Sequence, residues 1–375
     1  MKKTFGVILG YIIFSIILTA VRPAFATDEI DLLWEKFVSH ENDKLLKAAV
    51  NYLDEIYEKS IKAQKYSDAL KAVFKKAVID RHMNGSFSHI RTIEKAAETA
   101  SAELKPLMII VLAEWYKDHI NNIRDNVFSE RNSSGIPSGD ISEWDKNTTM
   151  AKVMSLYDEA VKECEKSGDI KISRYYDAIE KGDMPESFRP TLLDFVAHKA
   201  LDFYYCTQYM DEYAVDEKKK LSYDPALFAE AEEFVKFDAE RLYGQEASDS
   251  VILKSIKLYQ KLLAFHIKNN NEKALIDCDT DRLAFVKNNL KSENIGDIYV
   301  KAVKKFIEKY KKNEVCATAY MMLAWHYDDE KNLIEANKYL TEAEKLYEGT
   351  FYYEDIGRAR SRIFPKYYSI SARKV

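Results

Sequence analysis

Three residues at helical spacing are the first candidates for chemistry. Asp194, His198 and Asp202 lie four residues apart within the apolar segment RPTLLDFVAHKALDFYY. Positions i, i+4 and i+8 of a helix share one face, so these side chains could hold a metal ion or orient a base. The alternative is a structural histidine that is hydrogen-bonded to the neighbouring carboxylates. We favour the structural interpretation because no second set of ligands is visible.

A second acidic group resembles the start of a calcium-binding loop. Asp277, Asp279 and Asp281 alternate as the first ligands of such a loop do. The sixth position, which requires Gly, is Arg282, and the twelfth, which requires Glu, is Asn288. We therefore expect carboxylates in solvent at these positions rather than a calcium site.

The common catalytic motifs are missing from the chain. It contains no GxGxxG, GxxxxGK[ST], GxSxG or HExxH sequence, and His40-Glu41 lacks a second His four residues after the first. His326, Asp328 and Asp329 lie at a predicted turn, where we expect them in solvent. We therefore predict that the chain is not an enzyme and has no cofactor and no metal site.

The composition indicates what kind of scaffold carries these residues. Among 375 residues only 11 are Gly and 7 are Pro, while 31% are charged. Few turn-forming residues and many good helix formers favour long helices with short connections. We predict an all-α fold, an extended array of antiparallel helix pairs of the tetratricopeptide-like solenoid type.

The clearest helix pair is predicted near the C-terminus, in residues 317–350. A 34-residue frame places small and large apolar residues at tetratricopeptide positions. The expected packing residues are Tyr320, Leu323, Ala324, Tyr327, Ala336, Leu340 and Ala343. Such a pair cannot bury its apolar face alone, so it requires stacked helical neighbours, and such stacks usually bind other chains.

Periodicity and turn residues predict how the chain is divided. We expect helical hairpins in residues 27–130, a loop in 131–146 and a helical-repeat array in 147–362. Within that array, Asp224 and Pro225 make a good N-cap and first-turn pair, which predicts a helix to about residue 242. Further helices are expected over about 248–269, 271–289 and 296–312. Residues 363–375 alternate like a strand, which indicates a lone strand, a disordered tail or the start of a missing β-sandwich.

The first 26 residues have the pattern of a cleaved signal peptide. Lys2 and Lys3 precede an apolar run, and Ala24 and Ala26 supply the small residues that a signal peptidase requires before Thr27. The alternative is an uncleaved membrane anchor. Cleavage predicts an exported protein in the periplasm, at the outer-membrane face or outside the cell. Its formal net charge of −5, more negative after cleavage, disfavours binding to nucleic acid.

The four cysteines are Cys164, Cys206, Cys278 and Cys316. An even number in an exported chain allows three pairings, and none of the four has CxxC spacing. All lie within apolar helical patterns, where cysteine usually behaves as a small buried residue. We therefore favour buried thiols over disulfides and expect no zinc.

The order of segments resembles a known family. The blocks that carry the resemblance are DISEWD (140–145), FRPTLLDFVAHKALDFYY (188–205), DPALFAEAEEFVKF (224–237) and KLYQKLLAFHIKNNNEKALIDCDTDRLAFV (257–286). Together with the helix pair at 317–350, they are similar to the helical N-terminal region of large exported bacterial alpha-2-macroglobulin-like proteins. The resemblance spans essentially all of the chain after the signal peptide.

The resemblance implies a protease trap, in which a bait segment, β-sandwich domains and often a Cys-Glu-Gln thioester follow this region. None of these parts is present, and Cys278 and Cys316 are followed by Asp-Thr-Asp and Ala-Thr-Ala. We therefore expect a fragment with a protein partner, proteases being reached through a full-length protein. No functional residue is carried over, and the oligomeric state stays open.

Two other functional hypotheses remain. One is a glycan-binding outer-membrane protein of the starch-uptake type, which the 25 Tyr would suit. The other is an enzyme that uses the face of Asp194, His198 and Asp202.

Overall fold

The computed structural model describes residues 28–85, 87–122, 141–207, 221–242 and 250–365. The predicted signal peptide, most of the predicted loop at 131–146 and residues 366–375 of the predicted tail lie outside these ranges. Among the described residues, no helix has both the length and the apolar character needed to cross a bilayer.

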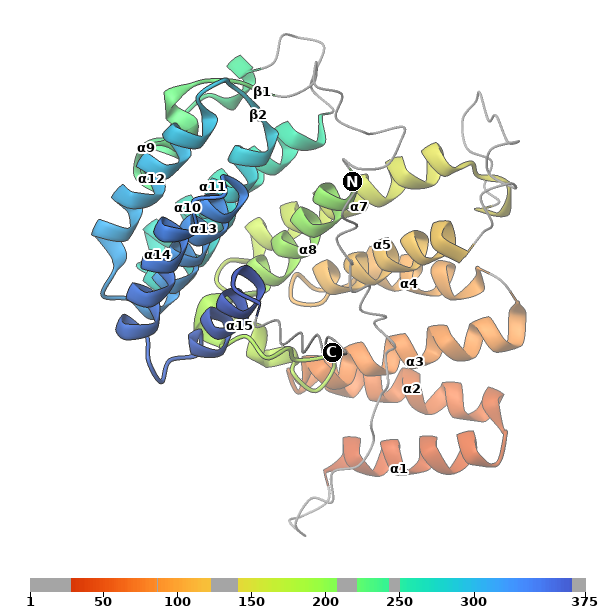
Figure 1. The fold of residues 1–375 in the computed structure, drawn as a ribbon. Coiled ribbons are helices and arrows are strands. Elements are labelled where there is room, and N and C mark those ends of the chain that lie inside the picture. Colours follow the sequence, from red (N-terminus) through yellow and green to blue (C-terminus); the bar gives the residue numbers. More distant parts are fainter. Residues whose placement is uncertain (1–27, 86, 123–140, 208–220, 243–249, 366–375) are drawn as a thin grey trace, which may run out of the picture. The chain divides into compact units, whose positions relative to one another are not determined.

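The described chain is all-α, as predicted, and consecutive helices pack against each other (Figure 1). It divides into two compact units, Met1–Thr148 with Ser173–Asp183, and Thr149–Ile172 with Met184–Val375. The helices of the first unit are α1 (Glu29–Asn42), α2 (Leu46–Lys62), α3 (Tyr66–Asn84), α4 (Ser88–Thr99) and α5 (Lys105–Asn122), with short helices η1 (Ile141–Glu143) and η2 (Ile172–Tyr175).

In the first unit, helices α1 to α5 lie side by side in chain order, each packed on the next (Figure 1). Phe37 of α1 and Leu53 and Ile56 of α2 are fully buried in one apolar cluster. The chain returns to this unit at Ser173–Asp183. There Tyr175 is buried, and its hydroxyl donates to the carbonyl oxygen of Glu103 at 2.7 Å.

The second unit contains the longer helical series. Its helices are α7 (Lys146–Ser167), η3 (Glu186–Phe188), α8 (Leu192–Thr207), η5 (Pro225–Phe228), α9 (Ala231–Phe234), η6 (Ala239–Leu242), α10 (Val251–Asn269), α11 (Glu272–Asn289), α12 (Ile295–Tyr310), η8 (Glu314–Cys316), α13 (Ala317–Asp329), α14 (Leu333–Leu346) and α15 (Tyr353–Ile363). The extended backbone is limited to a parallel pairing of β1 (Leu221–Ser222) with β2 (Leu290–Lys291).

Four connections between paired helices have the same backbone geometry. A residue with positive φ, between 54° and 62°, follows the first helix, and the amide of the next residue donates to the carbonyl five positions earlier, at 2.8–3.0 Å. This is the Schellman closure, which usually uses Gly at the positive-φ position. Here the positions are occupied by Lys44, Gln64, Asn270 and Lys331. The repeated turn explains why these helix pairs form, and the absence of Gly explains why the sequence does not reveal it.

One predicted helix does not form. Asp224 caps its first turn, accepting from the amide of Ala226 at 2.8 Å. However, Ala229 and Glu230 adopt extended ψ angles of 166° and 154°, so the segment breaks into η5, α9 and η6. The carbonyls of Leu227 and Ala229 bond to Arg282 instead. The prediction of a continuous helix to about residue 242 was therefore wrong.

Candidate functional site

The two acidic clusters that the sequence singled out lie in the second unit, on α8 and α11. Helix α8 begins with a reciprocal cap. The amide and hydroxyl of Thr191 donate to Asp194 Oδ2 at 2.9 and 2.7 Å, and the amide of Asp194 donates to Thr191 Oγ1 at 3.1 Å. This cap fixes Asp194 in the first turn, pointing into the interior.

The partner of Asp194 is a histidine that the sequence analysis did not single out. Asp194 Oδ1 lies 2.8 Å from Nε2 of His266 on α10, and both side chains are buried. The contact is close, but its angles are not those of a hydrogen bond. The expectation that His198 pairs with Asp194 was wrong, because both oxygens of Asp194 contact other residues. His266 lies in an apolar run, so periodicity marked it only as a core residue.

Helix α11 supplies two carboxylates to one arginine. Arg189, just after η3, donates from Nε to Asp277 Oδ2 at 3.0 Å and from Nη2 to Asp281 Oδ2 at 3.4 Å. Asp277 is buried, while 42% of the Asp281 side chain is exposed. The expectation of solvated acids is therefore wrong for Asp277, since Arg189 provides the charge that burial requires.

Two neighbours in this cluster have strongly perturbed pKa values. Partial burial, and the neighbouring carboxylate of Asp277, raise the pKa of Asp281, although 42% of its side chain is exposed. Burial, with Arg189 and His266 nearby, lowers the pKa of His198 well below 6.5. His198 Nδ1 lies 4.0 Å from Asp281 Oδ2. Such perturbations occur at active sites and in structural ion networks alike.

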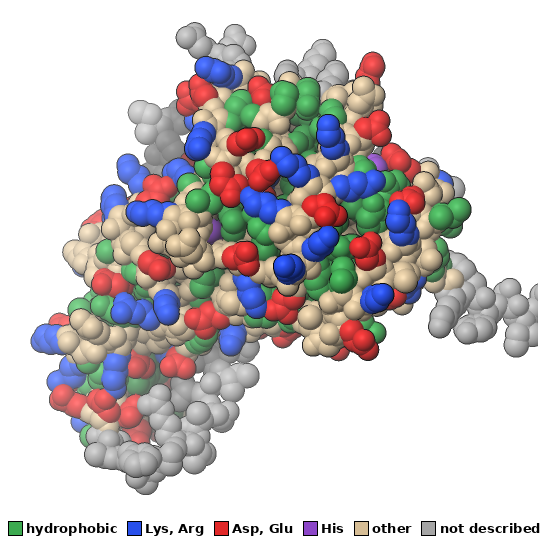
Figure 2. Space-filling view, turned by 90° about the vertical axis from the view of Figure 1, so that its left-hand side faces the viewer, with side chains coloured by type: hydrophobic (Ala, Val, Ile, Leu, Met, Phe, Trp, Pro, Cys, Tyr) green, Lys and Arg blue, Asp and Glu red, His purple; other side chains and the backbone are tan. Residues whose placement is uncertain are grey.

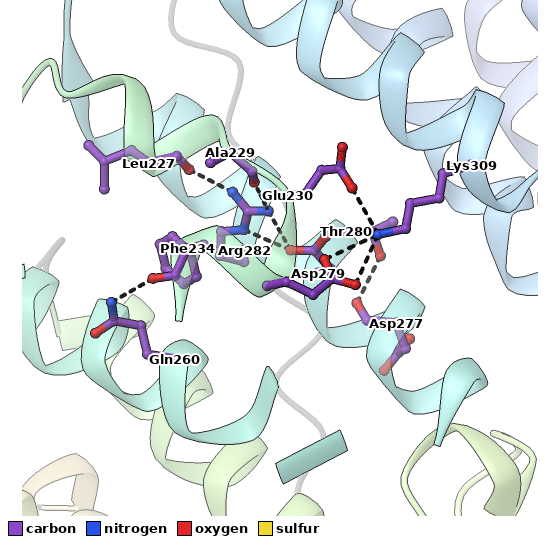
Figure 3. A network of polar contacts seen from close by, with 11 residues as sticks. Leu227, Ala229, Glu230, Phe234, Gln260, Asp277, Asp279, Thr280, Arg282 and Lys309 are labelled. Atoms are coloured by element: carbon purple, nitrogen blue, oxygen red, sulfur yellow. Dashed lines mark hydrogen bonds and ion pairs between the residues drawn. The ribbon is translucent and has the colours of Figure 1, made fainter. Parts of the chain in front are cut away.

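The third acid of α11 belongs to a separate network, shown in Figure 3. Asp279 is buried and accepts from Nε of the buried Arg282 at 2.8 Å. Arg282 also donates from Nη1 to the Leu227 carbonyl at 2.6 Å and from Nη2 to the Ala229 carbonyl at 3.1 Å. Its guanidinium carbon lies 4.6 Å from the centre of the Phe234 ring. The expectation that Asp279 is in solvent was also wrong.

The arrangement of these acids does not match a metal site. Each carboxylate of Asp277, Asp279 and Asp281 contacts an arginine, which competes with a cation for the same oxygens. Within the described ranges, no group of three or more His, Cys, Asp or Glu side chains is placed to hold a metal ion.

The predicted tetratricopeptide packing residues lie on the helix pair α13–α14. Six of the seven are buried, namely Tyr320, Leu323, Ala324, Ala336, Leu340 and Ala343. Tyr327 is half-buried and stacks on the ring of Tyr339 at 5.7 Å between centroids. Lys304 of α12 lies 5.9 Å from each of these two rings. Burial of these residues is what helix–helix packing requires, and the half-buried Tyr327 packs on a neighbouring ring.

His326 is another correction on this helix pair. We expected it in solvent, but it is buried against the ring of Tyr299, 5.8 Å between centroids. Gly296 of α12 makes this possible, because a Cβ there would lie 3.1 Å from His326 Cε1. Asp329 is exposed, as expected.

The four cysteines, all in described parts of the chain, form no disulfide, as we expected. Burial of three of them is confirmed, for Cys164, Cys278 and Cys316. Cys206 is exposed, so the prediction was wrong for this residue. It lies in the last turn of α8, after the apolar face of that helix has ended.

Comparison of the chain with protein-family models, with curated proteins and with solved structures found no match. The resemblance to alpha-2-macroglobulin-like proteins therefore depends on the quoted sequence blocks alone. Function has to be argued from the residues and their geometry.

Proposed function

We propose that the chain is a non-enzymatic helical scaffold that binds another polypeptide. The observation that carries this proposal is the exposure of large apolar side chains on the pair α13–α14. Ile334 is 82% exposed, Leu333 45% and Trp325 39%. Figure 2 shows one face of the molecule, on which hydrophobic side chains lie between basic and acidic ones. Aromatic and aliphatic anchors surrounded by charge are typical of protein-binding surfaces.

The buried cluster around Arg189 is better explained as a stabilising network. Arg189 offsets the charge of the buried Asp277 and also contacts Asp281. The pocket lined by Arg282 and Lys309 lies at the other network, beside α12. A catalytic pair requires a cavity that brings a substrate to it. Replacing His198 with Ala should accordingly lower the free energy of unfolding, and no catalysed reaction should be lost with it.

Site-specific photo-crosslinking tests the proposed binding surface. A photoreactive residue at Ile334 should give a covalent adduct with one defined polypeptide in exported fractions. The same residue at Lys62, exposed on α2, should not. Trp325→Ala should reduce the adduct severalfold, since truncating a Trp anchor commonly costs about 2 kcal/mol or more. Equal labelling from both positions would reject this surface.

The relation to alpha-2-macroglobulin-like traps remains part of the proposal, supported by the segments quoted above. An antibody to residues 224–286 tests it on the native product in exported fractions. A band severalfold above 43.5 kDa would place the chain in a longer trap-like protein. A band near the mass of the chain without its signal peptide would indicate that the helical scaffold acts alone.

Exposed Trp325 also favours the alternative of glycan binding, because aromatic faces stack on sugar rings. Calorimetry with pools of oligosaccharides distinguishes the two functions. Heat that disappears in Trp325→Ala would support a glycan ligand, and no heat from any pool would reject it.

A further inference from the structure

The irregular segment at residues 223–242, which we call the strap, lies across three helices of the second unit. Its short helices η5, α9 and η6 contact α10, α11 and α12. An irregular segment leaves many backbone carbonyls without helical partners, and burial of such groups requires other donors. The strap is therefore held by side chains of the helices beneath it.

Two side chains of the helices bond to four strap carbonyls. Arg282 of α11 bonds to the carbonyls of Leu227 and Ala229 (Figure 3). Gln260 of α10 donates to the carbonyl of Phe234 at 2.9 Å and to that of Phe237 at 2.7 Å. Contacts to main-chain carbonyls do not depend on the sequence of the bound segment. They are the kind of contact by which a groove holds a peptide in irregular conformation.

Apolar anchors fix the register of the strap. Leu227, Ala231, Phe234 and Ala239 are buried, although they belong to a segment only 20 residues long. The ring of Phe234 lies against the Arg282 guanidinium. In peptide recognition, main-chain hydrogen bonds usually provide affinity, and pockets for particular side chains provide specificity.

Charge complements these anchors on the α12 side. Glu230 lies 2.7 Å from Lys305 Nζ and 2.9 Å from Lys309 Nζ, and Glu232 lies 3.1 Å from Lys309 Nζ. Hydrogen bonds from Lys305 and Lys309 lower the pKa of Glu230 to about 2. Beside these pairs is a pocket whose lining includes Phe228, Lys305 and Phe306.

We infer that the faces of α10, α11 and α12 beneath the strap form a polypeptide-binding groove that the strap occupies in place of a partner. The partner is an acidic segment with an aromatic residue, which places acids on Lys305 and Lys309 and a ring against Arg282. This inference rests on the proposed polypeptide-binding function and deepens it. The strap competes with the partner, so the groove binds more tightly when the strap is loosened.

The test loosens the strap in the full chain. Glu230→Lys with Glu232→Lys reverses its charge, and Glu335→Lys with Glu354→Lys reverses two acids outside it as the control. The probe is a fluorescein-labelled peptide of residues 223–242. We expect the peptide to bind the strap variant at least tenfold more tightly than the unchanged chain or the control. The affinity should fall with added salt, and Phe234→Ala in the peptide should lower it at least tenfold.

Hydrogen exchange and size measurements keep the inference falsifiable. Strap amides should exchange at least tenfold faster in the strap variant, with α10 to α12 unchanged. The inference would be overturned if the strap is loosened but the peptide does not bind. It would also be overturned if the strap is unaltered or if the second unit unfolds globally. If the variant forms a dimer, the groove binds the strap of a second copy. That result would overturn the inference of a foreign partner. Loss of the Ile334 crosslink would instead contradict the proposed function and leave the peptide result unaffected.

Discussion

At the scale of single residues, Asp194 and His266 form a close contact of 2.8 Å between two buried side chains. We expect Asp194→Ala to destabilise the chain by about 3 kcal/mol, since it removes this pairing and the cap at Thr191. Urea denaturation measures the change. Glu98→Ala, exposed on α4, is the control and should stay within about 0.5 kcal/mol of the unchanged chain. Equal effects of the two substitutions would contradict the assignment.

His198 gives a prediction about pH. Its pKa in the folded chain lies well below 6.5, so as the pH falls through about 6.5 only the unfolded chain takes up the proton. The stability present above this pH is lost below it, by up to about 1.4 kcal/mol per pH unit. His198→Gln should therefore flatten the loss of stability between about pH 6.5 and 5. His82→Gln, exposed on α3, should leave the slope unchanged.

The charged residues show how far the partners of a side chain can be predicted from the sequence. The spacing of Asp194, His198 and Asp202 identified a helix face correctly, but Asp194 pairs with a residue 72 positions away. Asp277 and Asp279 were expected in solvent because acids rarely enter a core alone. No sequence motif identified Arg189 and Arg282 as the partners of these two acids. The sequence thus indicated which residues were unusual, and only the tertiary structure showed what neutralised them.

At the scale of elements, the helices from α10 to α14 were predictable because apolar periodicity and packing favour the same helical state. The strap was not predictable, because Asp224 and Pro225 form a sound local start for a helix. Arg282 and Gln260, both more than 20 residues away, then bond to the carbonyls that a continuous helix would have used. Tertiary contacts override local propensity at such a place.

The repeated turn between paired helices allows a direct test. Lys44, Gln64 and Lys331 have positive φ, which costs an L-residue roughly 1 kcal/mol relative to Gly. Replacing each by Gly should raise the free energy of unfolding by about 0.5–1 kcal/mol. Thermal and urea unfolding measure the gain. Glu55→Gly, at an exposed position in the middle of α2, should instead destabilise by about 1 kcal/mol. A loss at the three turn positions would show that their side chains stabilise the turn.

At the scale of the whole molecule, the chain divides into two compact units. Leu53 is buried in the apolar cluster of α1 to α3, and the pair of Asp194 with His266 is buried between α8 and α10. Because contacts are concentrated within each unit, we expect each to open as its own cooperative unit. Local damage in one core should then leave the exchange of the other unit unchanged.

Hydrogen exchange with mass spectrometry tests this separation. Leu53→Ala leaves a cavity in the first core, which should cost about 2–5 kcal/mol and speed the exchange of α1 to α3. The amides of α10 and α11 should keep their rates. Asp194→Ala should do the reverse, because its lost contacts lie in the second unit alone. If either substitution accelerated exchange equally in both units, the chain would unfold as one body, since cooperative coupling would then exceed the cost of opening either core.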